Sequence, residues 1–459
     1  MKRISNEINQ LLQRGVDAHI SLGVTGLSRA GKTAFITSVT NQLLYSSTHK
    51  AMPLLTAQSQ GRLLGARQVT QSNILTPTFG YNAAIDSLSL EPPVWPKPTT
   101  DVGAIKLALR YTPKKRTKKL MGSTATLYVD IVDYPGEWLL DLPLLELSYE
   151  QWSDSQYQRL DDTKQALAND WIHGVANFEP ERPCDDQVFN ELANTFRDYL
   201  HQCKDHGYHY VQPGRFVLPG EYAGAPILDF FPLPKSAFSN KTVKKSARYV
   251  LEQRFEEYKK EIVKPFFKHY FAQFNRQIVL VDLLGSLNQG KHAFEDMQFA
   301  LEQIIKSFKF GKHSLINRLF SPKTDKLLFA TTKIDHVTPE QQKNVDKLLQ
   351  TLIAPVWQYA SFEHVELKTM SVSSIQATEY GLVTDSNGKS PALRGQDMAY
   401  NAVTVYPGEV PDNLPHADYW AKTGFEFSPF APKQYSKLEP LGHIRIDAAL
   451  EYLLGDKLW

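Results

Sequence analysis

The segment GLSRAGKT, residues Gly26–Thr33, fits the pattern G-x-x-x-x-G-K-[ST] and constrains the fold more than any other part of the chain. A β-like run with apolar residues at Ile20, Leu22 and Val24 precedes it, and helix-type apolar spacing follows it. In a strand–loop–helix context, backbone N–H groups and the helix N-terminus surround a phosphate group. The sequence therefore predicts a phosphate-binding loop in an α/β protein; a plain glycine turn is the alternative.

Each position of this loop has an expected role. The Lys32 ammonium is expected to reach the β- and γ-phosphates and to act in catalysis, and the Thr33 hydroxyl is expected to bind Mg²⁺. The other positions are expected to bind the nucleotide, and they are Gly26, Ser28, Arg29, Ala30, Gly31 and Ala34.

Composition narrows the class of protein further. The 459 residues suffice for roughly two or three domains, and 51 Lys and Arg against 49 Asp and Glu give a net charge of +2. This balance argues against nucleic acid as the main partner. The two cysteines, Cys184 and Cys203, lack metal-ligand spacing, which predicts reduced thiols in a cytoplasmic protein.

The N-terminal segment is basic but lacks the apolar core of a signal peptide, and no apolar run approaches the length of a membrane span. One face of an expected N-terminal helix is apolar, at Ile4, Ile8, Leu11 and Leu12. Packing against the domain and peripheral contact with a membrane surface are both open interpretations of this face.

Two segments have the D-x-x-G form of the third GTPase motif, DYPG at Asp133 and DLLG at Asp282. Asp133 ends the second strand of an expected antiparallel hairpin whose first strand is Ile105–Tyr111, and this order is typical of Ras-like domains. We therefore assign Asp133 as a Mg²⁺ ligand and Gly136 as the residue that senses the γ-phosphate. Asp282 is interpreted as a strand-end residue near the site.

The base is predicted from KLLFATTKID, in which an apolar strand ends in the guanine-reading form [NT]-K-x-D. The Asp335 carboxylate can accept hydrogen bonds from N1–H and the 2-amino group of guanine, a pair of donors that adenine lacks. The Lys333 stem can pack on the base. A short loop after the next strand, at Ser374 and Ile375, is expected to present a backbone N–H to the guanine O6. These segments predict GTP and GDP as ligands, together with Mg²⁺; a surface turn is the alternative for TKID.

The first switch is expected between the phosphate-loop helix and Ile105. The segment NILTPTFGYN offers Thr76 and Thr78, and a switch threonine binds Mg²⁺ and the γ-phosphate only in the triphosphate state. TPTFGYN resembles the P-T-x-G-F-N switch of Arf-type GTPases, which implies Thr78 as the metal ligand. A polar turn without a ligand stays open here.

The expected fold is a mixed, mostly parallel sheet flanked by helices, the Ras-like P-loop NTPase core, with a large inserted helical domain. Helical spacing dominates the insertion, and Pro, Gly and aromatic residues dominate a later extended segment. The first core part, the insertion, the second core part, the extended segment and the C-terminal core helix are expected at 1–138, 139–275, 276–377, 378–441 and 442–459.

Seven segments together resemble the YcjX-like bacterial stress proteins: GLSRAGKT, GRLLGARQV, IKLALRY, DIVDYPGEW, IVLVDLLGSLNQG, TKID and HIRIDAALEYLLGDKLW. The resemblance covers most of the chain. It implies a Ras-like GTP-binding core with a helical insertion, in a cytosolic protein linked to envelope or general stress, and it supplies no partner.

The residue after D-x-x-G is a glutamine in Ras-like enzymes, where it orients the attacking water, but here it is Glu137. Its carboxylate can accept a hydrogen bond from that water, although it is repelled by the γ-phosphate. No arginine finger can be assigned from the sequence, and the candidates are Arg29, Arg62 and Arg67.

The sequence thus predicts a slowly hydrolysing GTP-dependent switch. Its phosphate state is expected to move the segment after D-x-x-G and, through it, the helical insertion toward a protein effector of unknown identity. The alternatives are an ATPase, a P-loop kinase and a non-catalytic scaffold that holds a nucleotide.

Overall fold

A computed structural model describes residues 18–71, 73–98, 100–114, 123–308, 324–362, 365–385, 388–422 and 424–459. The expected N-terminal helical face at Ile4, Ile8, Leu11 and Leu12 lies outside these residues. The described chain divides into two compact units. The first contains the described residues as far as Tyr134, then Phe274–Gly290 and the described residues from 324 onward; the second contains Pro135–Gln273 and helix α14, Lys291–Phe308.

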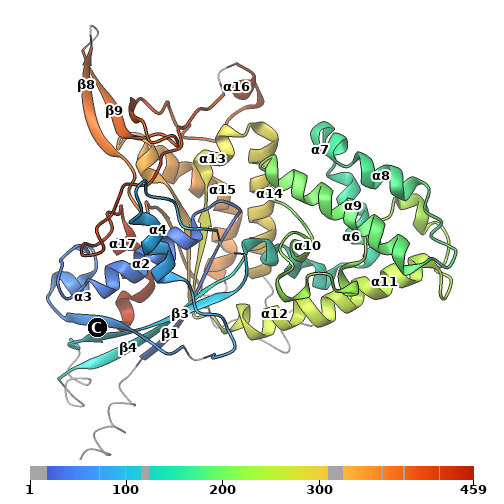
Figure 1. Ribbon diagram of the computed structural model, residues 1–459, viewed down its shortest axis with the longest axis horizontal. Coiled ribbons are helices and arrows are strands. Elements are labelled where there is room, and N and C mark those ends of the chain that lie inside the picture. The colour runs from blue at the N-terminus through green and yellow to red at the C-terminus, as the bar shows by residue number, and fades with distance from the viewer. Residues whose placement is uncertain are drawn as a thin grey trace, which may run out of the picture. The chain divides into compact units, whose positions relative to one another are not determined.

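Within the described residues, the first unit is built on a seven-stranded sheet in the order β2-β3-β4-β1-β5-β6-β7 (Figure 1). Strands β4, β1, β5, β6 and β7 are parallel neighbours, whereas β2, β3 and β4 pair antiparallel. The sheet is therefore mostly parallel, which confirms the predicted fold class. The strands span Ala18–Gly26 (β1), Leu63–Val69 (β2), Gly103–Tyr111 (β3), Ala125–Asp133 (β4), Arg276–Val281 (β5), Lys326–Thr331 (β6) and Glu366–Ser371 (β7).

Burial of the strands explains their sequence patterns. The central strand β5 is buried along its whole length, and its continuous apolar run suits a parallel strand covered on both faces. Strand β4 alternates buried and half-buried residues, as expected for the hairpin with β3. The edge strand β2, which was not predicted from the sequence, is mostly exposed or half-buried and carries little apolar periodicity.

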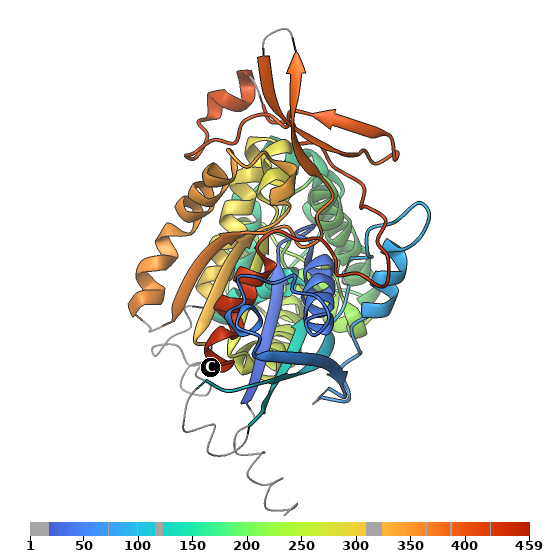
Figure 2. The same ribbon diagram turned by 90° about the vertical axis from the view of Figure 1, so that its left-hand side faces the viewer.

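Helices cover both faces of this sheet (Figure 2). Helices α2, Lys32–Leu44, and α17, Ile446–Leu454, contact each other and share one core with alternate side chains of the strands, such as Leu328 and Ala330 of β6. Helix α15, Gln342–Phe362, packs against β6 and β7. Shorter helices in this unit are α3 (Thr56–Ser59), α4 (Tyr81–Leu88), α13 (Leu283–Asn288) and α16 (Ala417–Lys422).

The segment after β7 forms a small antiparallel sheet in the order β10-β9-β8. Its strands are Glu379–Asp385 (β8), Gly388–Gln396 (β9) and Ala402–Val405 (β10). The sequence predicted extended structure here but missed the short helix α16.

The second unit (green to yellow in Figure 1) is helical. It is organised around buried aromatic rings, among them Trp152, Trp171 and Phe196. Its main helices are the 3₁₀ helix Gly136–Glu146, α6 (Tyr149–Gln158), α7 (Asp162–Leu167), α8 (Asn169–Ala176), α9 (Asp186–Asp205), α10 (Gly214–Val217), α11 (Ala247–Tyr258), α12 (Lys264–His269) and α14.

Helix α14 corrects the expected boundary, because the sequence analysis placed it within the core segment 276–377. In the structure, the buried Asp296 of α14 pairs with Lys164 of α7 at 2.6 Å. It also accepts from the backbone N–H groups of His209 and Tyr210, at 2.7 Å each. Apolar periodicity predicts that a helix is buried but not against which unit.

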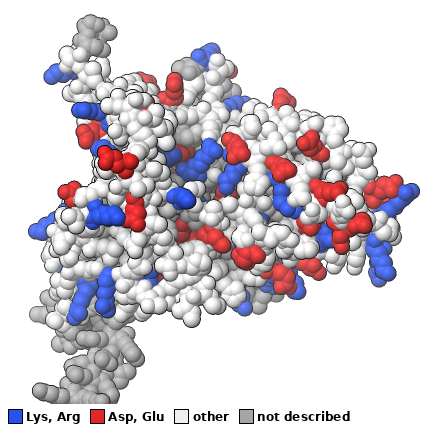
Figure 3. All heavy atoms as spheres, in the orientation of Figure 1, with Lys and Arg blue, Asp and Glu red and all other residues white. Residues whose placement is uncertain are grey.

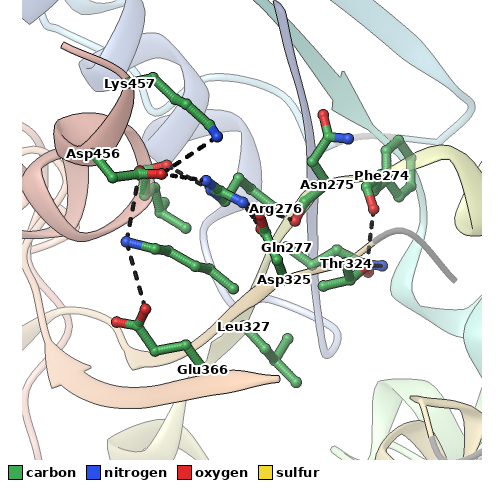
Figure 4. Close-up of polar contacts among 12 residues, drawn as sticks. Phe274, Asn275, Arg276, Gln277, Thr324, Asp325, Leu327, Glu366, Asp456 and Lys457 are labelled. Carbon is green, nitrogen blue, oxygen red and sulfur yellow. Dashed lines mark hydrogen bonds and ion pairs between the residues drawn. The ribbon is translucent and has the colours of Figure 1, made fainter. Parts of the chain in front are cut away.

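A polar cluster closes the amino ends of the central strands (Figure 4). The Arg276 guanidinium, 1% exposed, pairs with Asp456 at 2.8 Å and with Asp325, and it donates to the Leu453 carbonyl at 3.0 Å. Lys326 adds longer contacts to Asp456. These bonds attach the end of the C-terminal helical segment to β5 and β6.

On the face drawn in Figure 3, Lys and Arg side chains of the described residues are interspersed with Asp and Glu. Neither positive nor negative charge forms a large continuous patch there. Among the helices of the described chain, none has both the length and the apolar character that crossing a bilayer requires.

Candidate nucleotide-binding site

The loop between β1 and α2 has the backbone geometry that its glycines permit. A Cβ at Gly26 would lie 2.6 Å from the Leu280 carbonyl oxygen, so only glycine allows this approach of the loop to β5. Gly31, the residue before α2, has a φ of 76°. Glycine adopts this left-handed conformation at little energetic cost, because it has no Cβ.

Lys32 and Thr33 of this loop and Asp133 of β4 lie at the carboxyl ends of neighbouring parallel strands. Lys32 and Thr33 begin helix α2, and the Lys32 Nζ donates to the Gly26 carbonyl at 3.4 Å. Asp133 ends β4, which runs parallel to β1 in a register that pairs Asp133 with Val24. Its side chain is 1% exposed. Asp133 therefore lies at the same edge of the sheet as the phosphate loop.

The T-K-x-D segment leaves the same edge of the sheet from β6. Lys333 adopts a left-handed conformation, with a φ of 60°, and begins the 3₁₀ helix Ile334–His336. Asp335 is 4% exposed, and its Oδ2 accepts from the Ala377 N–H at 2.8 Å. Its carbonyl accepts from the Thr378 hydroxyl. The loop that follows β7 thus fixes the orientation of the Asp335 carboxylate.

Asp282, the aspartate of the second D-x-x-G copy, pairs with Lys333. It ends β5 and caps helix α13 by accepting from the Gly285 N–H at 3.0 Å. Burial alone would raise the pKa of Asp282, but the Lys333 ammonium and the Gly285 N–H hold it below its ordinary value. The carboxylate is therefore ionised, and its pairing with Lys333, a residue that lines the cavity described below, keeps the Lys333 side chain beside it.

A cavity of about 460 Å³ joins these segments, within the usual size range of ligand pockets. Its walls come from the phosphate loop, the T-K-x-D segment and the loop after β7. The residues predicted from sequence that line it are Arg29, Ala30, Gly31, Lys32, Thr33, Ala34, Lys333, Asp335, Ser374 and Ile375. All of these belong to the first unit.

An aromatic wall, which we define as Trp95, His336 and Phe430, was missed by the sequence analysis. The Trp95 indole donates to the Phe430 carbonyl at 2.9 Å, and the His336 ring meets the Phe430 ring edge-on at 5.1 Å between centroids. Burial lowers the pKa of His336, so the imidazole is held neutral despite the nearby Asp335. The proline-flanked sequences PPVWPKP and SPFAPK were the available signal, since such loops often carry binding residues.

The first-switch threonines lie beside the β3 end of this edge. Thr78 is exposed and forms an isolated parallel bridge with Ala104, which is opposite Val132 in β4. Adjacent strands lie about 4.8 Å apart. Thr78 is thus separated from β4 by two strand spacings, because β3 lies between them. The side chain of Thr76 is buried. Helix α4 follows directly after Thr78.

Gly136, Glu137, Arg62 and Arg67 are not among the residues that line the cavity in the described chain. Gly136 and Glu137 belong to the helical unit, where Glu137 pairs with Lys204 at 2.7 Å. Arg62 donates to backbone carbonyls of Thr112 and Leu458, toward the amino edge of the sheet, and Arg67 lies on the edge strand β2. Of the three arginine candidates, only Arg29 lines the cavity among the described residues.

The oxygen donors at this edge fit a magnesium ion. Mg²⁺ is a hard cation that takes carboxylate and hydroxyl oxygens and usually only one or two protein ligands beside phosphate and water. The Thr33 hydroxyl at the start of α2 and the buried Asp133 carboxylate at the end of β4 are such donors on neighbouring elements.

The mostly parallel sheet, with a phosphate loop after β1 and T-K-x-D after a parallel strand, defines a Ras-like P-loop NTPase core. The chain belongs to the YcjX-like family, DUF463, whose family model matches residues 20–458. It is 46% identical to the Ras-like GTPase YcjX of Escherichia coli K12 over 464 residues, with both chains fully covered. It is 42% identical over 477 residues to the Ras-like GTPase YcjX of Shewanella oneidensis, covering all of this chain and 98% of that protein. The predicted family is therefore confirmed.

Proposed function

We propose that the protein binds GTP and GDP with Mg²⁺ and hydrolyses GTP slowly as a nucleotide-dependent switch. The observation that carries this proposal is a single cavity lined both by the phosphate loop and by Asp335. The names of the two relatives, each a Ras-like GTPase, support the same activity.

Selectivity for guanine rests on the Asp335 carboxylate. An ionised carboxylate offers about four acceptor positions, and one oxygen is oriented by the Ala377 N–H. The remaining positions can accept from N1–H and the 2-amino group of guanine. Adenine presents an acceptor at N1 and no 2-amino group, so its binding would leave the base-facing acceptor positions of the buried carboxylate without donors, which disfavours ATP.

Binding of the phosphates falls to the loop and to Lys32. The loop N–H groups and the N-terminus of α2 favour negative charge, and the Lys32 ammonium can move from the Gly26 carbonyl to the β- and γ-phosphates. Thr33 and Asp133 would hold Mg²⁺, with Thr78 as the expected additional ligand from the first switch. The ion, when bound, neutralises developing phosphate charge.

Slow hydrolysis follows from the state of Glu137. Its carboxylate is engaged by Lys204 in the helical unit, and no glutamine stands at this position. We expect turnover on the order of 10⁻⁴ to 10⁻² s⁻¹, the range of unassisted switches. Glu137→Ala tests its expected catalytic role: slower turnover supports that role, whereas an unchanged rate removes it.

The segment after Asp133 supports coupling to the helical unit. Trp138 donates to the Leu218 carbonyl at 2.9 Å, and the Arg215 guanidinium lies 3.2 Å from the centre of the Trp138 ring. Asp141 accepts from the Gly214 N–H at 2.7 Å and from the Tyr258 hydroxyl at 2.6 Å. A displacement of Gly136 by the γ-phosphate would therefore be transmitted to several helices of that unit.

Hydrogen exchange tests this coupling directly. A GTP analogue and GDP should give different protection in Tyr134–Leu142 and in the helices that contact it. Equal protection in both states would mean that the γ-phosphate is not sensed.

We place this switch in the cytoplasm and in the bacterial stress response, with a protein effector. The two free thiols support a reducing compartment. The effector surface is expected beside the first switch, where Ile74 and Leu75 are 80% and 88% exposed.

The most informative experiment on the proposed function is identification of the bound nucleotide by mass spectrometry after purification, followed by exchange and turnover assays. Bound GDP, with GTP converted to GDP and phosphate, supports the proposal. Bound adenine nucleotide, or transfer of phosphate to a second substrate rather than water, would replace it with an ATPase or a kinase.

A further inference from the structure

Arg29 lies in the phosphate loop in a backbone conformation that disfavours a side chain. Its φ of 63° places it in the left-handed region, which glycine adopts freely and residues with a Cβ do not. The adjacent Ala30 N–H donates to the Leu27 carbonyl at 3.1 Å and holds the turn closed. The loop thus carries an arginine where a glycine would fold with less strain, and this arginine lines the cavity. Strain of this kind gathers at functional sites.

The Arg29 side chain is exposed, and its positive charge has no counterpart among the described residues. Within the described ranges between residues 18 and 459, its side chain makes no hydrogen bond and no ion pair. The two lysines of the cavity differ, since Lys32 donates to the Gly26 carbonyl and Lys333 pairs with Asp282. A guanidinium presents a planar fork of donors that matches phosphoryl oxygens. Arg29 is therefore available to a triphosphate without first giving up a described contact within the protein.

GTP hydrolysis needs stabilisation of charge at the γ-phosphate beyond that from Lys32 and Mg²⁺, and the other candidates from the sequence do not line the cavity in the described part of the chain. Arg62 and Arg67 lie away from the cavity, and the residue at the water-orienting position, Glu137, is engaged by Lys204. An arginine that stabilises the transition state can be supplied by the same chain or by a partner, and it accounts for a large part of the rate in switches that have one.

We propose that Arg29 is an arginine finger built into the phosphate loop. This inference rests on the proposed GTP hydrolysis. In that reaction a water oxygen bonds to the γ-phosphorus, and the bond from this phosphorus to the β–γ bridging oxygen breaks. The electron pair stays on the oxygen of GDP, and the protons of water leave with inorganic phosphate and to solvent. The Arg29 guanidinium donates to the bridging oxygen and to a γ-phosphoryl oxygen, where negative charge grows.

Because negative charge grows on the β–γ bridging oxygen, loss of Arg29 should affect the rate of hydrolysis more than nucleotide affinity. Charge on the bridging oxygen increases as the bond breaks, so a contact there lowers the barrier more than it strengthens ground-state binding. GDP lacks the γ-phosphoryl group, and its affinity should depend little on Arg29. Lysine keeps the charge but not the fork, so it should replace arginine only in part.

The test compares Arg29→Gly, Arg29→Lys and wild type, with Arg110→Ala as the control for loss of an exposed arginine on β3. Glycine suits the φ of 63°, so the variant removes the guanidinium without adding strain. Single-turnover GTP hydrolysis and GDP affinity are measured, together with capture of GDP by aluminium fluoride, which imitates the transferring phosphoryl group.

We expect Arg29→Gly to slow hydrolysis by about a hundredfold or more, to lose aluminium fluoride capture, and to change the GDP Kd by less than about threefold. Arg29→Lys should fall between Gly and wild type, and Arg110→Ala should match wild type. Wild-type turnover and fluoride capture in Arg29→Gly would overturn the inference and leave GTP hydrolysis standing. An inactive wild type would instead contradict the proposed function.

Discussion

Charged side chains lie at both ends of the parallel strands of the sheet, but in different surroundings. At the amino ends of β5 and β6, the Arg276 guanidinium is surrounded by Asp456, Asp325 and a backbone carbonyl (Figure 4). At the carboxyl ends, Asp335 is oriented by one N–H with acceptor capacity to spare, and the Arg29 side chain has no described partner. A charged group whose hydrogen-bonding capacity is fully used within the protein stabilises the fold. A charged group that lies beside a cavity with unused capacity is available to bind a ligand.

The conformation of the backbone differs between the two edges in the same way. Arg29, Gly31 and Lys333 have positive φ at the carboxyl edge. The residues of the amino-edge cluster, Arg276, Lys326 and Asp456, do not appear among the residues with positive φ in the described chain. Open α/β sheets bind ligands at the carboxyl ends of their strands, and the strained turns there are consistent with that rule.

The largest expected effect is on phosphate binding at the carboxyl edge. Lys32→Ala removes charge-assisted hydrogen bonds to two phosphates, each worth about 1.5–3 kcal/mol, so triphosphate affinity should fall at least about a hundredfold. Fluorescent GTP titration measures it, with the exposed Lys50→Ala as the matched control. Wild-type affinity in Lys32→Ala would remove the phosphate-loop assignment.

A substitution in the cluster at the amino ends of the strands should lower the stability of the fold rather than nucleotide affinity. Arg276→Ala breaks a buried ion-pair cluster and should lower the free energy of unfolding by roughly 3 kcal/mol, the lower end for buried pairs because both aspartates are partly exposed. Urea unfolding measures this change, and Arg276→Met separates loss of charge from loss of volume. GTP affinity of the folded variant should stay at the wild-type value; a loss of guanine selectivity would contradict the division between the two edges.

Loss of a ring from the aromatic wall should weaken nucleotide binding by a smaller factor that does not depend on the base. Trp95→Ala removes a ring from the base side of the cavity, and ring stacking contributes about 1–3 kcal/mol per base, so affinity should fall roughly tenfold. GTP, GDP and ATP should weaken by similar factors because every base has a π-face. Trp95→Phe should restore most of the affinity, and the exposed Tyr406→Ala should have no effect. Loss for GTP alone would assign Trp95 to the phosphates rather than the base.

The spacing of residues along the chain predicted those elements whose structure depends mainly on residues close in sequence. The phosphate loop, the β3–β4 hairpin and the strand before Thr332 each depend on residues within about a dozen positions, where apolar periodicity and glycine placement are informative. These segments were found where the sequence placed them.

Contacts across long sequence separations could not be predicted in this way. Trp95 and Phe430 are 335 residues apart and meet only because the segment after β10 returns to the cavity. The apolar periodicity of helix α14 does not indicate which unit covers it, and its Asp296 pairs with Lys164 of the helical unit. Lys204 engages Glu137 from a helix that spacing alone does not relate to the D-x-x-G segment.

The most direct test of the central claim is competition of GTP, XTP and ATP against a fluorescent nucleotide, for wild type and Asp335→Asn. Xanthine carries an oxygen in place of the guanine 2-amino group, so the wild-type carboxylate should reject XTP and prefer GTP over ATP. The asparagine amide supplies a donor, and the preference should shift from GTP to XTP by tenfold to a hundredfold or more, since each mispaired buried polar group costs roughly 1–3 kcal/mol. Equal affinity of wild type for ATP and GTP, or an unchanged preference in Asp335→Asn, would contradict a guanine-reading site at the carboxyl edge of this sheet.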